Sequence, residues 1–398
     1  MAGKPKVVGG VDTHADTLHV AVLTMLGRKL ADKEFHTDAR GYWDAIRFMT
    51  GLGRVQSVGV EGTSSYGAGL TKALITAGLE VIEVNRPDRA ARRRRGKSDP
   101  LDAELAARAV LSGNATSAPK DPTIEAIRAL FNARRSAVKA RAAAMNQITS
   151  LLVTAPDPLR AKYRPLKENP LVNALASCRP GGEDPIAAAV LTALKTLAKR
   201  HQFLTSQADE LEAQVDVLVT AANPALRAAF GVGPNTAAQL LITAGGNPER
   251  LRSEASFAAL CGAAPVQASS GKTSKHRLSR GGDRGGNCAL HRIALVRMSS
   301  HPQTREYVAR QRKKNKSTKA ILRMLKRAIA REMLRLLTHQ IPIDDYSDLR
   351  PARQTKNITV TAVAEIFDVW PTIISRLERG LYRNDVMAEQ YREWLTAA

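Results

Sequence analysis

The chain has 398 residues, with 60 Lys and Arg against 37 Asp and Glu, a formal net charge of +23 and a pI of about 10.3. That length allows two or three domains with their own cores, and so strong a positive field attracts polyanions and is typical of nucleic-acid-binding proteins. No apolar run is long enough to span a membrane and no signal-peptide pattern is present, so we expect a cytoplasmic, nucleoid-associated protein without a membrane partner.

Residues 1–115 have the alternating pattern of an α/β domain. β-branched runs at 6–13 and 18–24, and a third run at 29–37, predict three antiparallel strands. The expected elements that follow are helix 39–49, strand 55–61, helix 69–77, strand 79–85 and helix 99–111. Three antiparallel strands followed by alternating helices and strands are typical of an RNase H-like (RuvC-like) fold.

Four carboxylates stand at the ends of these predicted elements. Asp12 and Glu61 close two strands, and Asp99 and Asp102 lie three residues apart at the start of a helix. Acidic side chains at buried strand ends are costly to desolvate unless they are paired or bind metal. A pair of Mg²⁺ ions held by carboxylates explains them and predicts phosphoryl transfer.

Helix capping is an alternative for the second pair. Asp99 would be the N-cap with Pro100 at the first helical position, and the helix dipole would favour Asp102. Capping does not explain the two acids at the strand ends. Five basic residues just before this helix are candidate nucleic-acid contacts: Arg92, Arg93, Arg94, Arg95 and Lys97.

Residues 116–220 form a helical middle region. Apolar residues recur by threes and fours over 124–152 and 194–218, and a proline-rich connection between them is expected to break the helix. The two heptad helices would form an antiparallel pair within one chain or a coiled coil between chains.

Residues 221–345 form a mainly helical region with two candidate phosphate sites. Gly231 and Gly233 lie in a helix-hairpin-helix pattern whose backbone N–H groups suit a phosphate, although a plain helical hairpin uses the same residues. Residues 269–287 have no apolar periodicity and are expected to form a loop. Its basic candidates are Lys272, Lys275, Arg277 and Arg280.

A basic amphipathic helix is expected at 316–337. Its apolar face is predicted to carry Ile321, Leu325, Ile329, Met333 and Leu336, and its polar face Lys319, Arg323, Lys326, Arg327 and Arg331.

Ser270, with Ser269 beside it, is a second candidate for chemistry. A serine hydroxyl is a weak nucleophile that needs a base, a metal or a positive field, and the basic loop supplies the field. A flexible polar linker is the alternative. Cys178, Cys261 and Cys288 show no zinc or disulfide spacing.

Residues 346–398 are predicted to form a helix-turn-helix tail. A first helix includes 364–367, a turn follows at 368–369, and Pro371 opens a second helix that ends at Glu378. In that motif the second helix enters the major groove, whereas any small helical hairpin would give the same pattern.

Taken together, these segments resemble transposases of the insertion-sequence 110 family. The matching pieces, in family order, are GVDTHADTLHVAV, VEGTSSYG, KSDPLDAELAA, GVGPNTAAQLL and FAALCGAAPVQASSGKTSKHRLSRGGDRGGN. They span residues 6–340 and leave the tail outside the core of the resemblance.

The resemblance implies roles for particular residues and partners. It implies that Asp12, Glu61, Asp99 and Asp102 are Mg²⁺ ligands of a RuvC-like domain, and that Ser270 forms a covalent phosphoserine intermediate with DNA. It also implies a structured bridge RNA, element-end and target DNA as partners, and a dimer or tetramer in which two subunits complete one site.

Two other functions remain open at this point. A nuclease resembling Holliday-junction resolvases would use metal-activated water, with Ser270 only contacting phosphate. A DNA-binding regulator would use the tail and an inactive RNase H-like domain, which the intact acidic quartet disfavours.

Overall fold

The computed structural model describes residues 4–84, 98–181, 184–245, 251, 253–267, 276–278, 281–339, 341–343, 345–380 and 382–397. The chain divides into two compact units. The first comprises residues 1–126 and 244–250, and the second comprises residues 127–243 and 251–398.

The first unit contains a five-stranded mixed sheet. Its strands are β1 (Lys6–Thr13), β2 (Thr17–Thr24), β3 (Lys29–His36), β4 (Arg54–Glu61) and β5 (Val81–Val84), in the order β3-β2-β1-β4-β5. Strands β1, β2 and β3 are antiparallel neighbours, while β4 runs parallel to both β1 and β5. The predicted order of elements along the chain, three antiparallel strands followed by alternating helices and strands, is confirmed.

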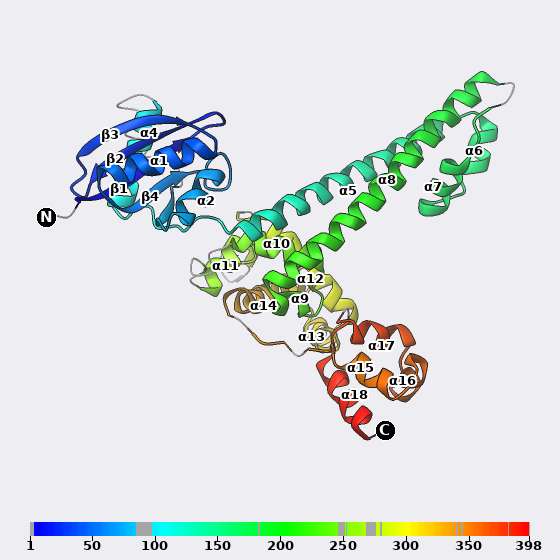
Figure 1. Cartoon of the computed structure of the whole chain (residues 1–398). Helices are drawn as coiled ribbons and strands as arrows, with labels where there is room; N and C mark the ends of the chain where they lie inside the picture. Colours follow the sequence, from blue (N-terminus) through cyan, green and yellow to red (C-terminus); the bar gives the residue numbers. More distant parts are fainter. Residues whose placement is uncertain are drawn as a thin grey trace. The chain divides into compact units, whose positions relative to one another are not determined.

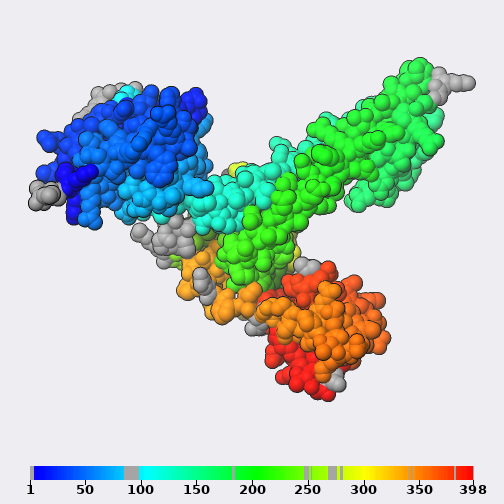
Figure 2. Space-filling view, viewed as in Figure 1, coloured from blue at the N-terminus to red at the C-terminus, as the bar shows by residue number. Residues whose placement is uncertain are grey.

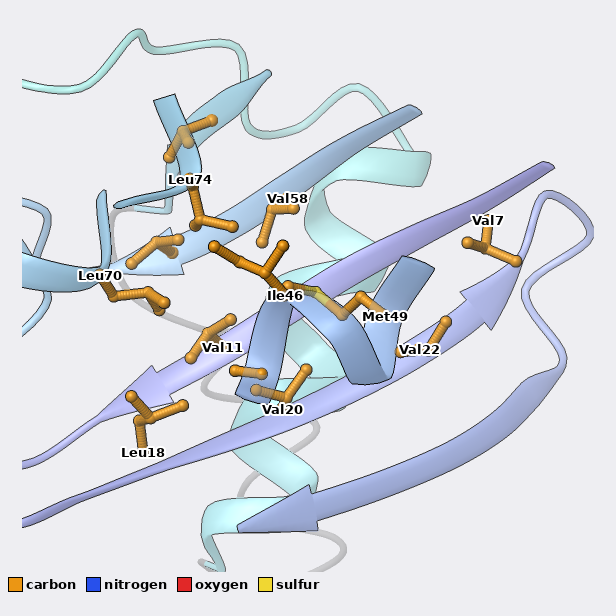
Figure 3. Close-up of a cluster of buried hydrophobic side chains, with 13 residues drawn as sticks. Val7, Val11, Leu18, Val20, Val22, Ile46, Met49, Val58, Leu70 and Leu74 are labelled. Atoms are coloured by element: carbon orange, nitrogen blue, oxygen red, sulfur yellow. The ribbon is translucent and has the colours of Figure 1, made fainter. Parts of the chain in front are cut away.

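One face of the sheet is covered by α1 (Ala39–Leu52) and α2 (Ala68–Thr76). Figure 3 shows the apolar side chains that meet there, from β1, β2 and β4 on one side and from the two helices on the other. Met49 and Leu74 are fully buried in this layer. Each such side chain contributes roughly 1.5–3 kcal/mol on burial, so this layer anchors the sheet.

The opposite face carries α4 (Asp99–Leu111), which packs unusually close to the strands. A Cβ atom at Gly10 would lie 2.2 Å from the carbonyl oxygen of Ala103, and one at Gly59 would lie 2.7 Å from that of Ala106. Both glycines and the alanine-rich helix face are therefore required for the helix backbone to rest on β1 and β4.

The second unit contains two long helices, α5 (Pro122–Thr154, which begins in the first unit) and α8 (Pro185–Ala222). They run side by side within the one chain (Figures 1 and 2), with Ala137 of α5 packed against Leu204 and Ala208 of α8. Arg134 also forms an ion pair with Glu212 across them. Of the two pairings open from the sequence, the structure has the one within the chain.

The proline-rich connection is not simply a break, because it contains α6 (Asp157–Tyr163) and α7 (Glu168–Ser177). These helices pack with the distal ends of α5 and α8 around Leu175 and Leu194. Prolines lie in the first turn of α6 and of α8, where the absent N–H is not needed. They therefore start helices as well as ending them.

The remaining body of the second unit is mainly helical. Its elements are α9 (Pro224–Ala228), α10 (Pro234–Ala244), α11 (Glu254–Leu260), β6 (Pro265–Gln267), β7 (His276–Leu278), α12 (Arg284–Ser300), α13 (Pro302–Lys313) and α14 (Thr318–Thr338). Arg297 on α12 joins the body together, because it donates to Glu332 on α14 at 2.6 and 2.8 Å and to the carbonyl of Phe230.

The last helices form a small cluster with their own core. They are α15 (Leu349–Thr355), α16 (Val360–Ile366), α17 (Pro371–Glu378) and α18 (Asp385–Ala397). Helices α16 and α17 lie where the sequence predicts two helices, with Asp368 in the left-handed region (φ 50°) between them. In the part of the chain that is described, no helix has both the length and the apolarity to cross a bilayer.

We expect Gly10→Ala to destabilise the first unit by about 3 kcal/mol, because the added methyl group overlaps the α4 backbone. Urea unfolding followed by circular dichroism measures the change. Gly51→Ala is the matched control: this helical glycine on α1 has open space around it, and alanine there should be neutral or stabilising by up to about 1 kcal/mol. Equal effects of the two substitutions would contradict the close packing of α4.

We expect Arg353→Leu to destabilise the last four helices by about 3–5 kcal/mol, since it leaves the buried Glu378 without its partner. Arg353 donates to both oxygens of Glu378, at 2.6 and 3.0 Å, and Tyr391 donates to the same carboxylate at 2.9 Å. Hydrogen exchange of the α17 amides measures the loss. The double variant Arg353→Leu/Glu378→Leu should recover much of the protection, and no recovery would refute this reading.

Candidate functional site

Two acidic residues lie side by side at the carboxyl ends of β1 and β4. Val11 pairs with Val60 in the parallel register, so Asp12 and Glu61 are the next residues on neighbouring strands. Each follows the same local pattern, Gly-Val-acid, and side chains alternate between the faces of a strand. Since Gly10 and Gly59 face α4, the two carboxylates lie on the α4 face of the sheet, just beyond the helix contact.

Helix α4 begins at the same end of the sheet. Its N-cap is Ser98, so Asp99 is the first helical residue, and the prediction that Asp99 would be the N-cap is wrong by one position. Asp102 is 1% exposed. A carboxylate that only complements the helix dipole can do so at the surface, where it avoids the cost of desolvation. Burial of Asp102 therefore favours a role in a site over simple capping.

His14 joins the acidic residues, which the sequence did not reveal. Its Nε2 atom lies 3.2 Å from an oxygen of Asp12 and 3.3 Å from an oxygen of Asp99. The turn between β1 and β2 fixes its backbone, because the His14 N–H donates to Thr17 at 2.9 Å and Thr37 donates to the His14 carbonyl at 3.2 Å. The missed signal was the position of His14, two residues beyond Asp12.

These three residues form a group that can hold a cation. One ligand atom from each of Asp12, His14 and Asp99 lies within 4.8 Å of the others. The His14 Nε2 atom is shielded from solvent, lies between the two carboxylates and has no hydrogen-bond partner among the described residues. Two carboxylates whose oxygens lie this close together fit a divalent cation, which would offset their mutual repulsion.

The structure brings together some of the predicted site residues and leaves others untested. Asp12 and Asp99 belong to the three-residue group; Glu61 and Asp102 lie on the same face of the sheet but outside that group. The other predicted contacts include several outside the described residues: Arg92, Arg93, Arg94, Arg95, Lys97, Ser269, Ser270, Lys272, Lys275 and Arg280. Arg277 is described and is exposed on β7.

The prediction that residues 269–287 form a loop is wrong for part of the segment that the structure describes. It contains the strand β7 and the start of α12, and β7 pairs with β6 in an antiparallel hairpin. Gly282 (φ 87°) allows the chain to pass so close to α11 that a Cβ would lie 2.4 Å from the Leu260 carbonyl. Asp283 then caps α12 by accepting from Gly285 at 2.8 Å.

Lys326 is not on the polar face of its helix, as the sequence predicted, but is buried at 5% exposure. Its ammonium donates to the amide oxygen of Asn287 at 2.5 Å, and Asn287 in turn donates to the carbonyls of Cys261 and Gly262. Burial lowers the pKa of Lys326. Burial, with Asp283 nearby, raises the pKa of Cys261 to about 12, so that thiol stays protonated. The chain entering β6 is held by this network.

The first glycine of the Gly-Val-Gly-Pro segment has a conformational role. Gly231 turns the chain before α10 with φ 79°, a region that favours glycine. A cavity of about 220 Å³ lies at the start of α10, and it is lined by Asn235 and Thr236 and by Arg134, Arg135 and Arg292 from α5 and α12. These arginines were not among the predicted contacts, because they are distant in sequence.

The mixed sheet with carboxylates at the ends of β1 and β4 and at the start of α4 is consistent with an RNase H-like domain. Comparison with known families agrees. Residues 9–155 match the DEDD domain model of IS110 elements, described as a transposase, and residues 223–309 match the model described as the transposase IS116/IS110/IS902 family. The two matches together span more than half of the chain, and the chain belongs to this family of transposases.

A curated relative is similar over part of its length. It is the "Insertion element IS110 uncharacterized 43.6 kDa protein" of Streptomyces coelicolor, which is 36% identical over 140 residues. The match covers 34% of this chain, and the chain spans about a third of the length of that relative.

We expect saturating Mg²⁺ or Mn²⁺ to raise the thermal midpoint of the protein by several degrees, since a ligand bound only to the folded state adds about 2.7 kcal/mol at 100 times its Kd. Asp12→Asn should remove this metal-dependent increment because it removes a charged ligand. Asp44→Asn on α1, distant in sequence and already paired with Arg47, is the control and should keep it. Retention of the increment in Asp12→Asn would argue against a metal site here.

Proposed function

We propose that this protein is a DNA transposase that excises and inserts its own insertion sequence. The main support for this proposal is the group formed by Asp12, His14 and Asp99 at the end of the sheet, in a chain that belongs to a transposase family. We infer that the full acidic set is Asp12, Glu61, Asp99 and Asp102, and that it holds Mg²⁺, with two ions as the working number.

The carboxylates would act by placing positive charge where the phosphodiester reacts. When bound, the divalent ions supply Lewis-acid stabilisation of the attacking and leaving oxygens. Carboxylate oxygens suit Mg²⁺, whereas an imidazole nitrogen does not, so the carboxylates of Asp12 and Asp99 would hold the ion and His14 would lie beside them.

Ser270 is the proposed nucleophile, with Ser269 as the neighbouring alternative. Its hydroxyl oxygen forms a bond to phosphorus as the bond from phosphorus to the sugar oxygen breaks, and the hydroxyl proton passes to the leaving sugar oxygen. The product is a covalent phosphoserine link between protein and DNA. The family resemblance supports this step, and it requires the RuvC-like site of one subunit to act with the serine of another in a dimer or tetramer.

The partners are element-end and target DNA, together with a structured bridge RNA. Residues 346–398 contain seven basic and seven acidic residues, so the whole net charge of +23 resides in residues 1–345. This distribution of charge supports binding of the nucleic acids by residues 1–345. A regulator that depended on the tail alone would be expected to concentrate its positive charge there.

A trapping experiment tests the nucleophile. The protein is incubated with Mg²⁺, bridge RNA and element-end DNA, and covalent protein–DNA adducts are resolved on a denaturing gel. We expect an adduct with the wild type and none with Ser270→Ala, because the variant lacks the attacking oxygen.

Ser269→Ala is the matched control and should retain the adduct. An adduct that persists in Ser270→Ala and disappears in Ser269→Ala would move the assignment by one residue. Asp12→Asn should abolish strand cleavage while leaving binding largely intact. Cleavage of DNA without any adduct would instead support the nuclease that uses metal-activated water.

A further inference from the structure

A basic groove lies between α14 and the β6–β7 hairpin in the second unit. It has a volume of about 460 Å³, and its lining includes Arg323, Arg327, Arg331, His276 and Pro265. The three arginines are spaced by four residues, so they follow one face of α14 like a ladder. None of the described residues that line this groove is acidic.

Two of these arginines are fixed in place by main-chain carbonyls, and no carboxylate among the described residues forms an ion pair with them. Arg323 donates to the main-chain carbonyl of His276, and Arg327 donates to that of Glu254 at 2.7 Å. A carbonyl accepts a hydrogen bond but carries no net charge, so each guanidinium keeps its full positive charge and its other N–H donors. By contrast, Arg331 is paired with the carboxylate of Glu254 at 2.7 Å.

The anchoring carbonyls also determine where the charges point. Arg323 is tied to the first residue of β7, and Arg327 to the first residue of α11, and both side chains line the groove. Preorganised cations of this kind lose little side-chain entropy when they bind an anion. The planar guanidinium also matches the geometry of a phosphate.

We propose that this groove binds the phosphodiester backbone of a nucleic-acid strand, with Arg323 and Arg327 as its phosphate contacts. The inference rests on the proposed function and deepens it. In sequence, β6 ends three residues before Ser270 and β7 begins six residues after it. A strand held by α14 along the groove would therefore lie against the two strands that border the serine-bearing segment. Arg323 and Arg327 would position this nucleic-acid strand and are not catalytic residues.

Binding by the full chain tests the groove, with EDTA present so that no cleavage can occur. Fluorescence anisotropy measures the Kd for an element-end DNA duplex and for an RNA duplex of equal length over a range of salt. For Arg323→Gln/Arg327→Gln we expect affinity to fall about tenfold at physiological salt and the slope of log Kd against log salt to decrease by about 2, as for two lost phosphate contacts.

Two further variants make the result specific. Lys199→Gln/Arg200→Gln removes the same charge from an exposed part of α8 and should change the slope little. Arg323→Lys/Arg327→Lys keeps the charge and should restore most of the slope. A loss for the DNA alone assigns the groove to DNA, and a loss for the RNA alone assigns it to RNA.

The groove proposal is overturned if the double Gln variant binds both polymers as the α8 variant does. It is also overturned if the double Lys variant is as weak as the double Gln variant, since the arginines would then act only through the fold of the hairpin. Neither result depends on the covalent adduct. If the wild type forms the adduct and the double Gln variant binds normally, only the groove proposal is removed. If the wild type forms no adduct and the double Gln variant binds weakly, only the serine mechanism is removed.

Discussion

The N-terminal unit depends on one close contact, that of the α4 backbone with Gly10 and Gly59. Without side chains at these two positions, the helix rests directly on β1 and β4, and its alanines fill the space that remains. That contact aligns the start of α4 with the carboxyl ends of both strands. The acidic residues then face one another because each strand places its acid two residues beyond its glycine. A packing constraint therefore sets the geometry of the candidate metal site.

The charges of the second unit divide into two kinds. Arg297 and Arg353 donate to carboxylates and hold helices together, so their charge is compensated within the fold. Arg323 and Arg327 donate to main-chain carbonyls, which fixes their position but leaves their charge available. High basic content alone does not distinguish these roles. The acceptor that each guanidinium uses separates a structural arginine from one that is suited to an external anion.

Much of the first unit was predictable, because Asp12, Glu61 and Asp99 lie at element ends that local patterns define well; the predicted helix 99–111 has the bounds of α4. The place of His14 in the site could not be predicted, since its proximity to Asp99 arises from a tertiary contact. Lys326 was placed on the wrong face because helical periodicity does not reveal that Asn287 satisfies a buried ammonium. In the connection between the long helices, prolines were interpreted as breaks although several begin new helices.

The long helices α5 and α8 have a further consequence. At 1.5 Å per residue, the 33 residues of α5 extend roughly 50 Å, about the rise of 15 base pairs of duplex DNA. Helices α6 and α7, at the far ends of α5 and α8, have their own apolar core and can keep their shape at that distance. The number of residues in α5 and α8, rather than any contact along them, therefore sets how far α6 and α7 lie from the opposite ends of the two long helices.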